Sequence, residues 1–383
     1  MYKILIANYS PEFNDGRVQR VSSLCQLFDK RGINYSVISF GSKKLNTQNS
    51  IKLDSIVLKV LNPVDRVARK TSIKHNRTKL RNIVSSLRAF IRPDPYIIDV
   101  LINLRKLSKL IEKKDVVIIS VPWFSLMAFL LTIRAKYVIL DFRDLYLGNP
   151  IFSKPNSKFD TLFLSWALRR VDEVWVTTER AFEEISRVCT VKTTVVSNGI
   201  SYKDAVKISS LNLTGNRHSV SDKIRIGYFG NLGGSRDFTQ FFRKLDNIHG
   251  VELFGAGNFD TPHQDIFGKK YLGMLEKDNL YEFMSRTDVV IVCIRHEEHA
   301  EFAIPAKIFE AMCFGMPILL VCPNNAAAKS LLDLHDYPHC HCEDESQLSL
   351  DTIVECSKKV AKPTVIDRDS IFSNALNLDK ANE

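Results

Sequence analysis

The chain has 383 residues, which exceeds one ordinary domain and favours two. Its 45% hydrophobic and 25% charged residues exclude a disordered or fibrous protein. The formal net charge of +10 favours an anionic partner, and the window 66–92 contains nine Lys or Arg and no Asp or Glu.

The sequence gives no sign of a membrane span, a leader or a metal site. The best apolar run, 123–133, falls short of the about eighteen residues that a spanning helix needs. The run at 3–7 is too short for the apolar part of a signal peptide, so we expect a first strand and a cytoplasmic protein. The eight cysteines lack the spacing of a disulfide framework and are expected as free thiols. His and Cys residues cluster between 335 and 342, but neighbours in a strand face opposite sides, so we expect no metal there.

In chain order, the first half alternates strand-like and helix-like segments. Strands are predicted at 3–7, 35–39, 116–119, 137–140 and 174–177. A helix is predicted over 17–30, with Gly32 as its stop and one apolar face made by Val18, Val21, Cys25 and Phe28. This alternation predicts a parallel sheet.

A polar stretch at 200–223 has no convincing long apolar face, and we place a domain boundary there. The predicted domains are 1–205 and 222–362, and the tail 363–383 is predicted to be helical and to pack back on the first domain. The alternation resumes with predicted strands at 224–230, 251–254, 289–293 and 318–321 and helices at 237–247, 275–285 and 305–314. Ligands of open parallel sheets bind beyond the carboxyl ends of the strands, so two such domains are expected to face each other across a ligand cleft.

The segment PAKIFEAMCFGMP shows an unusual placement of charge. Pro305 suits the first position of a helix, so Lys307 falls in the first turn and Glu310 one turn later. A lysine there opposes the helix dipole, whereas a bound phosphate would be favoured by both the dipole and the free amides. A carboxylate one turn away can accept two hydroxyls of a ribose. An ordinary amphipathic helix with two solvated charges explains the segment alone equally well.

Two glycine-rich turns favour the ligand interpretation. GYFGNLGGSRDF places Gly230, Gly233 and Gly234 between a predicted strand and helix, and ELFGAG places Gly255 and Gly257 after the next strand. Backbone amides in such turns can approach a phosphate or a sugar. One glycine turn is weak evidence, but two of them in register with the Lys-Glu helix are stronger.

Several segments together resemble the family 4 glycosyltransferases of bacterial polysaccharide and lipopolysaccharide assembly. They are NYSPEFNDGRVQR, DFRDLY, VVSNGI, YFGNLG, LFGAG and PAKIFEAMCFGMPIL, which span most of the chain. The resemblance implies an α/β protein of the GT-B fold, with two Rossmann-like domains. It implies an acceptor in the first domain, a nucleotide sugar mainly in the second, and transfer with retention. The reaction that the resemblance implies needs no cofactor and no metal.

The resemblance also assigns residues to roles. The catalytic group is expected to be Lys307, Glu310, Glu301 and Asp144. The donor side is expected to comprise Gly16, Arg17, Gly230, Asn231, Gly255, Gly257, Arg295, Ile304, Pro305 and Ala306. The acceptor side is expected to comprise Asn14, Asp15 and Trp123. Eight residues, rather than the family's usual seven, separate Glu301 from Glu310.

The resulting hypothesis is transfer from a UDP-sugar to a lipid-linked or polysaccharide acceptor. The alternative is a UDP-sugar 2-epimerase, which has the same architecture and needs no acceptor. The basic window 66–92 suggests peripheral contact with an anionic membrane on the cytoplasmic face, although a solvated loop would look the same. Phe90 is the only aromatic residue in that window, so we do not expect nucleic-acid binding.

Overall fold

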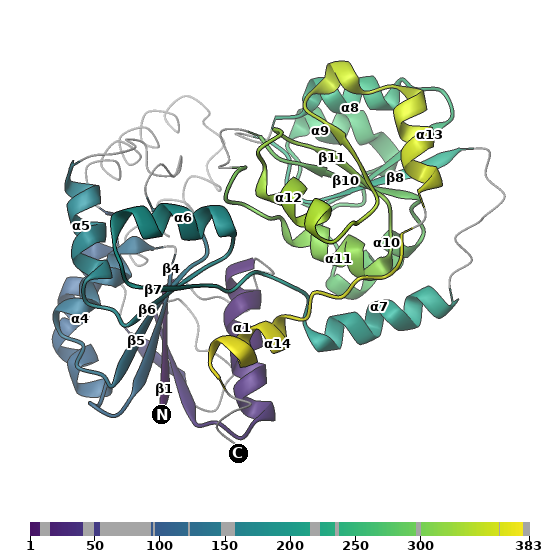
Figure 1. Ribbon diagram of the computed structural model, residues 1–383. Coiled ribbons are helices and arrows are strands. Elements are labelled where there is room, and N and C mark those ends of the chain that lie inside the picture. The colour runs from purple at the N-terminus through teal and green to yellow at the C-terminus, as the bar shows by residue number, and fades with distance from the viewer. Residues whose placement is uncertain are drawn as a thin grey trace, which may run out of the picture. The chain divides into compact units, whose positions relative to one another are not determined.

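The computed structural model describes residues 1–7, 16–40, 50–53, 93–94, 96–121, 123–146, 158–214, 223–233, 237–295, 300–359 and 361–377. The chain divides into two compact units (Figure 1). Unit 1 comprises Met1–Ser197 with Phe372–Glu383, and unit 2 comprises Asn198–Ile371. The chain therefore leaves unit 1 once and returns to it at its end.

Unit 1 contains a parallel sheet of seven strands. They are β1 (Tyr2–Ala7), β2 (Tyr35–Phe40), β3 (Ser50–Leu53), β4 (Val116–Val121), β5 (Tyr137–Phe142), β6 (Glu173–Val176) and β7 (Lys192–Val195). Their order is β3-β2-β1-β4-β5-β6-β7, so the direction of winding reverses between β1 and β4. Ile4 of β1 lies opposite Val37 on one side and Ile118 on the other, and all three are fully buried. Apolar runs of this kind are typical of parallel strands covered on both faces.

Helices accompany this sheet. They are α1 (Gly16–Lys30), α4 (Ile97–Leu110), the 3₁₀ helix η1 (Phe124–Leu131), α5 (Lys158–Leu168) and α6 (Glu179–Val188). The prediction of α1 is confirmed, since Val21, Cys25 and Phe28 are buried on its inner face and Gly32 adopts a left-handed φ of +64° after its end. That conformation costs glycine little and stops the helix.

A last helix, α14 (Arg368–Ala375), spans the division between the units. Phe372 is fully buried in unit 1, with its ring 6.1 Å from the ring of Trp175 and 4.9 Å from the guanidinium carbon of Arg20. Phe372 of α14 is therefore part of the core of unit 1.

Unit 2 contains a parallel sheet of five strands. They are β8 (Ile224–Phe229), β9 (Val251–Ala256), β10 (Val289–Cys293), β11 (Ile318–Val321) and β12 (His339–Cys342). The helical segments of this unit are α7 (Tyr202–Thr214), α8 (Thr239–Asp246), α9 (Thr261–Phe267), η2 (Gly268–Lys270), α10 (Lys277–Ser285), α11 (Ala306–Phe314), α12 (Ala327–Leu334), η4 (Glu345–Gln347) and α13 (Leu350–Lys358). Two apolar clusters pack around the sheet, one with α8, α9 and α13 and the other with α7, α10, α11 and α12. The sheet order is β12-β11-β10-β8-β9.

The helix α7 corrects one sequence expectation. The polar stretch at 200–223 was expected to lack an apolar face, but α7 buries Ala205 and Ile208 in the core of unit 2, with Leu211 packed beside them. These three residues recur at every third position, which gives a stripe too narrow to stand out in a polar segment. The units divide at Ser197–Asn198, ahead of this helix.

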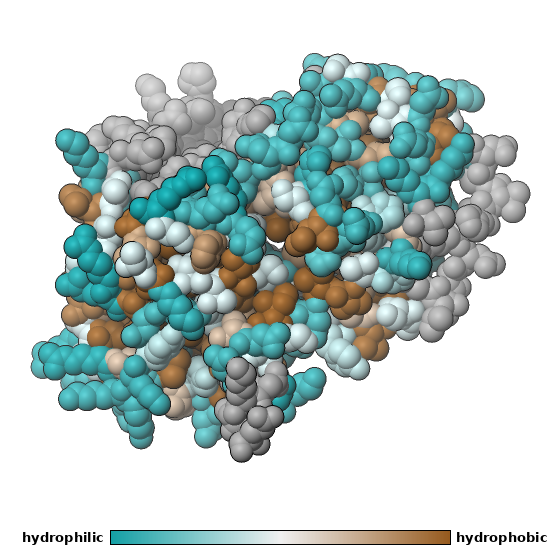
Figure 2. All heavy atoms as spheres, viewed as in Figure 1, coloured by the Kyte–Doolittle hydropathy of each residue, from teal (hydrophilic) through white to brown (hydrophobic). Residues whose placement is uncertain are grey.

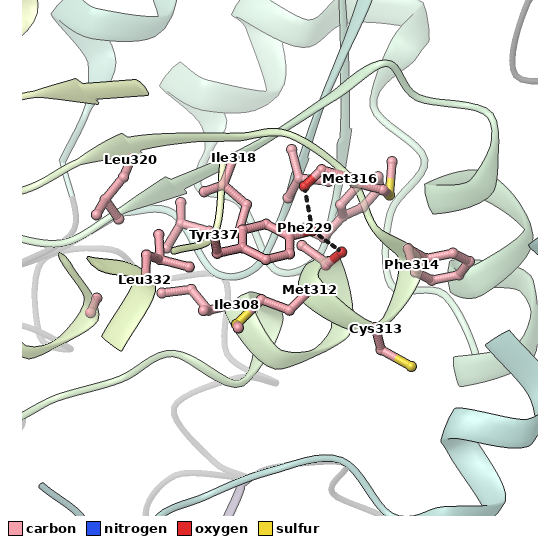
Figure 3. Packing of buried hydrophobic residues seen from close by; sticks show 14 of the residues in the cluster. Phe229, Ile308, Met312, Cys313, Phe314, Met316, Ile318, Leu320, Leu332 and Tyr337 are labelled. Atoms are coloured by element: carbon pink, nitrogen blue, oxygen red, sulfur yellow. Dashed lines mark hydrogen bonds between the residues drawn. The ribbon is translucent and has the colours of Figure 1, made fainter. Parts of the chain in front are cut away.

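The packing of α11 fixes the position of the helix that the sequence singled out. Ile308 and Met312 lie in a fully buried cluster with Tyr337 (Figure 3). The hydroxyl of Tyr337 donates to the carbonyl oxygens of Ala311 at 3.1 Å and Met316 at 2.9 Å. These carbonyls lie in the last turn of α11 and just beyond it, and the Ala311 carbonyl also accepts the amide of Met316 at 3.0 Å. The tyrosine therefore anchors the carboxyl end of α11.

Strand β12 explains why the His and Cys residues near 340 do not gather. Cys340 and Cys342 are buried on one face, whereas His339 and His341 lie half-buried on the other. Within the described ranges, no group of His, Cys, Asp or Glu is arranged to hold a metal ion. Among the helices of those ranges, none is both long and apolar enough to cross a membrane.

Candidate functional site

The candidate site of unit 2 lies at the carboxyl edge of its sheet. The winding direction reverses between β8 and β10, which is the position where open parallel sheets bind their ligands. Gly230 directly follows β8, and Arg295 follows β10 by two residues. The segment that leads into α11 also leaves the sheet at the end of β10. The topology therefore places the ends of three predicted ligand segments at this one edge.

The two glycine turns are in direct backbone contact. Gly257 has a φ of +140°, and a β-carbon on it would lie 1.6 Å from the carbonyl oxygen of Gly230. The amide of Gly230 donates to the carbonyl of Ala256 at 3.0 Å, and the amide of Asn258 donates to the side-chain oxygen of Asn231 at 3.4 Å. The structure thus brings together the two turns that the sequence picked out separately. Only glycine fits at position 257.

At two other positions in these turns, close packing against neighbouring side chains explains why the residue is glycine. Gly255 is buried in β9, and a β-carbon on it would lie 2.6 Å from the rings of Phe259 and Phe267. Gly233 has a φ of +116°, and a β-carbon there would lie 2.5 Å from the carboxylate of Asp260. Core packing alone accounts for glycine at 255, whose carbonyl accepts the amide of Leu272.

Helix α11 begins at Ala306, one residue later than predicted, and Pro305 is its N-cap. Proline offers no side-chain acceptor, so the N-cap residue does not cap the amides of the first turn. Lys307 is the second residue of the helix, and its Nζ lies 2.5 Å from Oε2 of Glu310. The Glu310 side chain is only 6% exposed, whereas that of Lys307 is 26% exposed. The two residues predicted to contact different parts of a ligand therefore form an ion pair with each other.

The pair keeps unused bonding capacity. An ammonium group has three donors and a carboxylate has two oxygens, so among the described residues this one contact leaves two donors and one oxygen for a ligand. Burial raises the pKa of Tyr281 on α10, and the negative charge of Glu310 raises that pKa further. The phenol is fully buried, and within the described residues its oxygen has no hydrogen-bond partner. An anion at the helix start and a hydroxyl beside Glu310 would both find partners here.

The turn before α11 contains two further predicted residues. Glu301 and Ile304 are half-buried in it, while Ala306 is exposed. The amide of Ala327 donates to the carbonyl of Ala300 at 2.9 Å, which ties the start of this turn to α12.

The side chain of Arg295, after β10, contacts the two residues that precede α8. Its Nη2 donates to the carbonyl oxygen of Asp237, and its guanidinium carbon lies 5.0 Å from the centre of the Phe238 ring. The side chain and amide of Thr239 donate to the Asp237 carboxylate and hold the pKa of that group below its usual range. Arg295 therefore lies on the carboxyl side of the sheet and is bound to the protein there.

Sequence reasoning missed a buried histidine beside this loop. His263 is fully buried, with Nδ1 2.5 Å from Oδ1 of Asp260 and Nε2 accepting the amide of Phe238 at 3.3 Å. Because the Phe238 amide donates to Nε2, Nδ1 is the ring nitrogen that can donate to Asp260. Asp260 is also the N-cap of α9, with proline following in the first turn. The run Asp-Thr-Pro was the available signal, because it is typical of a helix start.

In unit 1, two predicted residues follow strands at the corresponding edge. Trp123 comes two residues after β4, with a φ of +126° and its ring 4.4 Å from that of Tyr96. Its indole nitrogen is buried without a hydrogen-bond partner among the described residues. Asp144 is exposed two residues after β5. A non-glycine residue in the left-handed region is strained, and such strain is concentrated at functional sites.

The first-domain loop is described only at its end. Gly16 and Arg17 are the first two residues of α1. Asn14 and Asp15 lie outside the described residues, as does the basic window 66–92.

A second feature that sequence reasoning missed joins α1 to β5. Arg20 and Asp141 are both fully buried, with Nη2 and Oδ1 2.8 Å apart. The arginine also donates to the carbonyl of Val196, and Ser120 donates to the carboxylate at 3.2 Å. The pair spans the reversal point between β1 and β4. Its only sequence signal was the presence of Asp141 in DFRDLY, 121 positions away from Arg20.

Comparison with known proteins tests the fold. No protein-family model matches the sequence, and no curated protein sequence matches it. Solved structures do match. Sucrose-phosphate synthase from Thermosynechococcus elongatus is 12% identical with a TM-score of 0.61, covering 99% of this chain and 98% of its own. Anabaena HepE in complex with UDP and glucose is 12% identical with a TM-score of 0.62, covering 99% of both chains. Staphylococcus aureus TarM is 10% identical with a TM-score of 0.62, again covering 99% of both.

The chain has the GT-B glycosyltransferase fold. The predicted α/β class with two Rossmann-like parallel sheets is confirmed, with seven strands in one sheet and five in the other. At 10–12% identity, the likeness establishes the fold and transfers no residue roles. The case for a ligand site within this GT-B chain depends on its own glycine turns and on α11.

Proposed function

We propose that this GT-B protein is a glycosyltransferase that uses a nucleotide diphosphate sugar. The observation that supports this most directly is the start of α11, where uncapped amides, Lys307 and the buried Glu310 lie together. Amides and a cation suit a diphosphate, and a carboxylate suits the hydroxyls of a ribose. UDP is the proposed nucleotide, because the matched HepE and TarM structures are complexes with UDP.

The proposed reaction breaks the bond from the anomeric carbon to the diphosphate oxygen and forms one to an acceptor oxygen. Lys307 and the α11 amides stabilise the charge that develops on the leaving diphosphate. The leaving oxygen takes the proton of the acceptor hydroxyl on the same face of the sugar, which gives retention. Glu310 accepts hydrogen bonds from the ribose and fixes the nucleotide. Since Lys307 supplies the positive charge, the proposal includes neither a metal nor a cofactor.

The acceptor belongs to unit 1 in this proposal. Trp123, after β4, is its proposed contact together with Asn14 and Asp15, and Asp144, after β5, is a proposed catalytic residue. A lipid-linked or polysaccharide acceptor, a cytoplasmic location and membrane contact through 66–92 complete the proposal.

Thermal unfolding with a panel of nucleotides tests the donor. A ligand that binds the folded state raises its melting temperature according to its concentration and Kd. We expect UDP and UDP-sugars to raise it more than GDP, ADP, CMP or dTDP compounds do. Product analysis without acceptor should show an unchanged UDP-sugar; its conversion into an epimer would instead support the epimerase.

Substitutions in α11 test the site. We expect Lys307→Ala and Glu310→Ala each to reduce kcat/KM at least about a hundredfold, because each removes a charged contact to the donor. The matched control is Lys329→Ala, which breaks a similar ion pair within a helix, to Asp333 in α12, and should retain activity. Circular dichroism confirms folding. Unchanged kinetics in both site variants would contradict the assignment.

A further inference from the structure

Helix α4 exposes an apolar face to solvent. Ile98, Leu101 and Ile102 are 41%, 52% and 56% exposed. Arg105 and Lys109 continue the same stripe, at seven and eleven positions after Ile98, which keeps all five on one side of the helix. The opposite side buries Asp99, Val100, Asn103 and Leu107. The polar Asp99 and Asn103 are thus turned inward while three large apolar side chains face solvent.

Helix α5 repeats this arrangement. Phe159 and Leu162 are 52% and 68% exposed, and Phe163, Trp166 and Arg170 follow at the same spacing as in α4. The rings form a continuous stack, with centroids 6.0 Å apart from Phe159 to Phe163 and 5.6 Å apart from Phe163 to Trp166. The guanidinium of Arg170 covers Trp166 at 4.5 Å. Each stripe therefore begins with apolar side chains and ends with a cation.

The exposed charges on the two helices have a single sign. Asp99 and Asp160 are the only acidic residues in α4 and α5, and they are 1% and 4% exposed. Asp160 accepts the hydroxyl of Tyr146 at 2.5 Å, which holds its carboxylate inside. The exposed charged residues of α4, α5 and the two positions after α5 are Arg105, Lys106, Lys109, Lys158, Arg169 and Arg170.

The two stripes belong to neighbouring parts of unit 1. Both helices pack against η1. The ring of Tyr146 lies 4.5 Å from that of Phe124 in η1 and 6.5 Å from that of Phe163 in α5. Leu131, at the end of η1, is 58% exposed and adds to the apolar surface. Figure 1 shows α4 and α5 one above the other at the left margin, where Figure 2 shows brown side chains among teal ones.

We propose that the α4–α5 face, defined by these stripes, binds the surface of an anionic lipid bilayer. Aromatic and aliphatic side chains enter the boundary between headgroups and acyl chains, and neighbouring cations bind anionic headgroups. The charge pattern favours this occupant over a second copy of the chain. A symmetric dimer through this face would bring its basic ends against a surface without exposed acidic partners on either helix. The proposal is independent of the donor site in unit 2.

Co-sedimentation of the full-length protein with vesicles tests the proposal. We expect binding to phosphatidylcholine vesicles that contain phosphatidylglycerol, weaker binding to phosphatidylcholine alone, and loss of the difference at high salt. Absence of binding to the anionic vesicles would overturn the proposal.

Substitutions then locate the binding face. Leu101→Asp combined with Leu162→Asp should weaken vesicle binding at least about tenfold, and Arg105→Glu combined with Lys109→Glu should do the same. The matched controls are Val206→Asp, at a 51% exposed apolar position on α7, and Lys269→Glu, at an exposed position in η2. Both controls should bind like the wild type. Equal binding by all variants would show that another surface is responsible and would overturn the proposal.

Two measurements distinguish membrane binding by this face from self-association and from the donor-site proposal. Sedimentation velocity of the wild type and of the Leu101→Asp, Leu162→Asp variant should give the same monomer mass; conversion of a dimer to a monomer without vesicle binding would assign the face to self-association. The UDP-dependent thermal shift should be equal in both proteins, which shows that the variant is folded. Failure of UDP to bind either protein would count against the donor proposal and leave the vesicle result valid.

Discussion

Buried carboxylates in unit 1 are held in two different ways. Asp141 faces the guanidinium of Arg20, so its charge has a counter-charge. Asp94 is bound instead by neutral donors, namely the amide and hydroxyl of Ser125 at 2.8 and 2.7 Å and the amide of Tyr96 at 3.0 Å. Burial raises the pKa of Asp94 to about 6, although these hydrogen bonds lower it in part. The folded protein therefore favours the neutral acid more than the unfolded chain does.

This difference predicts a pH dependence of stability. Below the ordinary pKa of 3.8 Asp94 is protonated in both states, and as the pH rises to about 6 the unfolded state ionises first. The contribution of Asp94 to stability is therefore present at low pH and is lost across this window, by an amount on the order of 3 kcal/mol. Asp94→Asn should lack that loss when urea unfolding is followed by tryptophan fluorescence at several pH values.

The exposed Glu112 provides the control for this measurement, since its side chain is 65% exposed. Glu112→Gln should keep the pH profile of the wild type. A profile of Asp94→Asn that parallels the wild type from pH 4 to 6 would show that Asp94 does not titrate as proposed.

At the scale of the elements, the contact between the two glycine turns gives the clearest test. Gly257→Ala places a methyl group against the Gly230 carbonyl at a φ of +140°, so the turns must separate. We expect a loss of stability of about 3 kcal/mol or more and a smaller thermal shift with UDP. The control is Gly250→Ala, at a φ of +86° with no atom near the new carbon, which carries backbone strain without a collision. Its cost should be about 1–2 kcal/mol, with an unchanged UDP shift.

Equal effects of the two alanines would show that backbone conformation alone, and not the contact between the turns, is responsible. If a stable Gly257→Ala protein kept the wild-type increase in melting temperature with UDP, these turns would not be part of the donor site.

The elements also show where sequence reasoning succeeds. The strands β10 and β11 were predicted with their observed ends, and α11 within one residue, because apolar runs there are bounded by Gly315 and two prolines. Helix α7 was missed because its buried stripe is narrow. The ion pair of Arg20 with Asp141 could not be predicted, since it joins positions brought together only by the winding of the sheet. The pairing of Lys307 with Glu310 was within reach, because residues three apart on a helix are neighbours.

At the scale of the whole molecule, a residue late in the chain packs in the unit that the first part of the chain forms. The sheet of unit 1 is built from the first 197 residues, yet its core includes Phe372, which arrives after all of unit 2. The tail 363–383 was predicted to be helical and to pack back on the first domain. No local pattern reveals that Phe372, the only aromatic residue of that tail, is buried, because α14 has only Ile371 and Phe372 as large apolar residues.

This arrangement predicts a selective loss of stability in unit 1. Phe372→Ala removes a fully buried ring from contact with Trp175 and Arg20 and should lower the free energy of unfolding by about 3–5 kcal/mol. The three tryptophans, at 123, 166 and 175, all belong to unit 1, so their fluorescence follows that unit alone. The matched control is Val365→Ala, at a 49% exposed position of unit 2, which should change stability by less than about 0.5 kcal/mol. Because the proposed donor site lies in unit 2, Phe372→Ala should still bind UDP at temperatures below its fluorescence transition. An unchanged fluorescence midpoint would show that Phe372 does not support the core of unit 1.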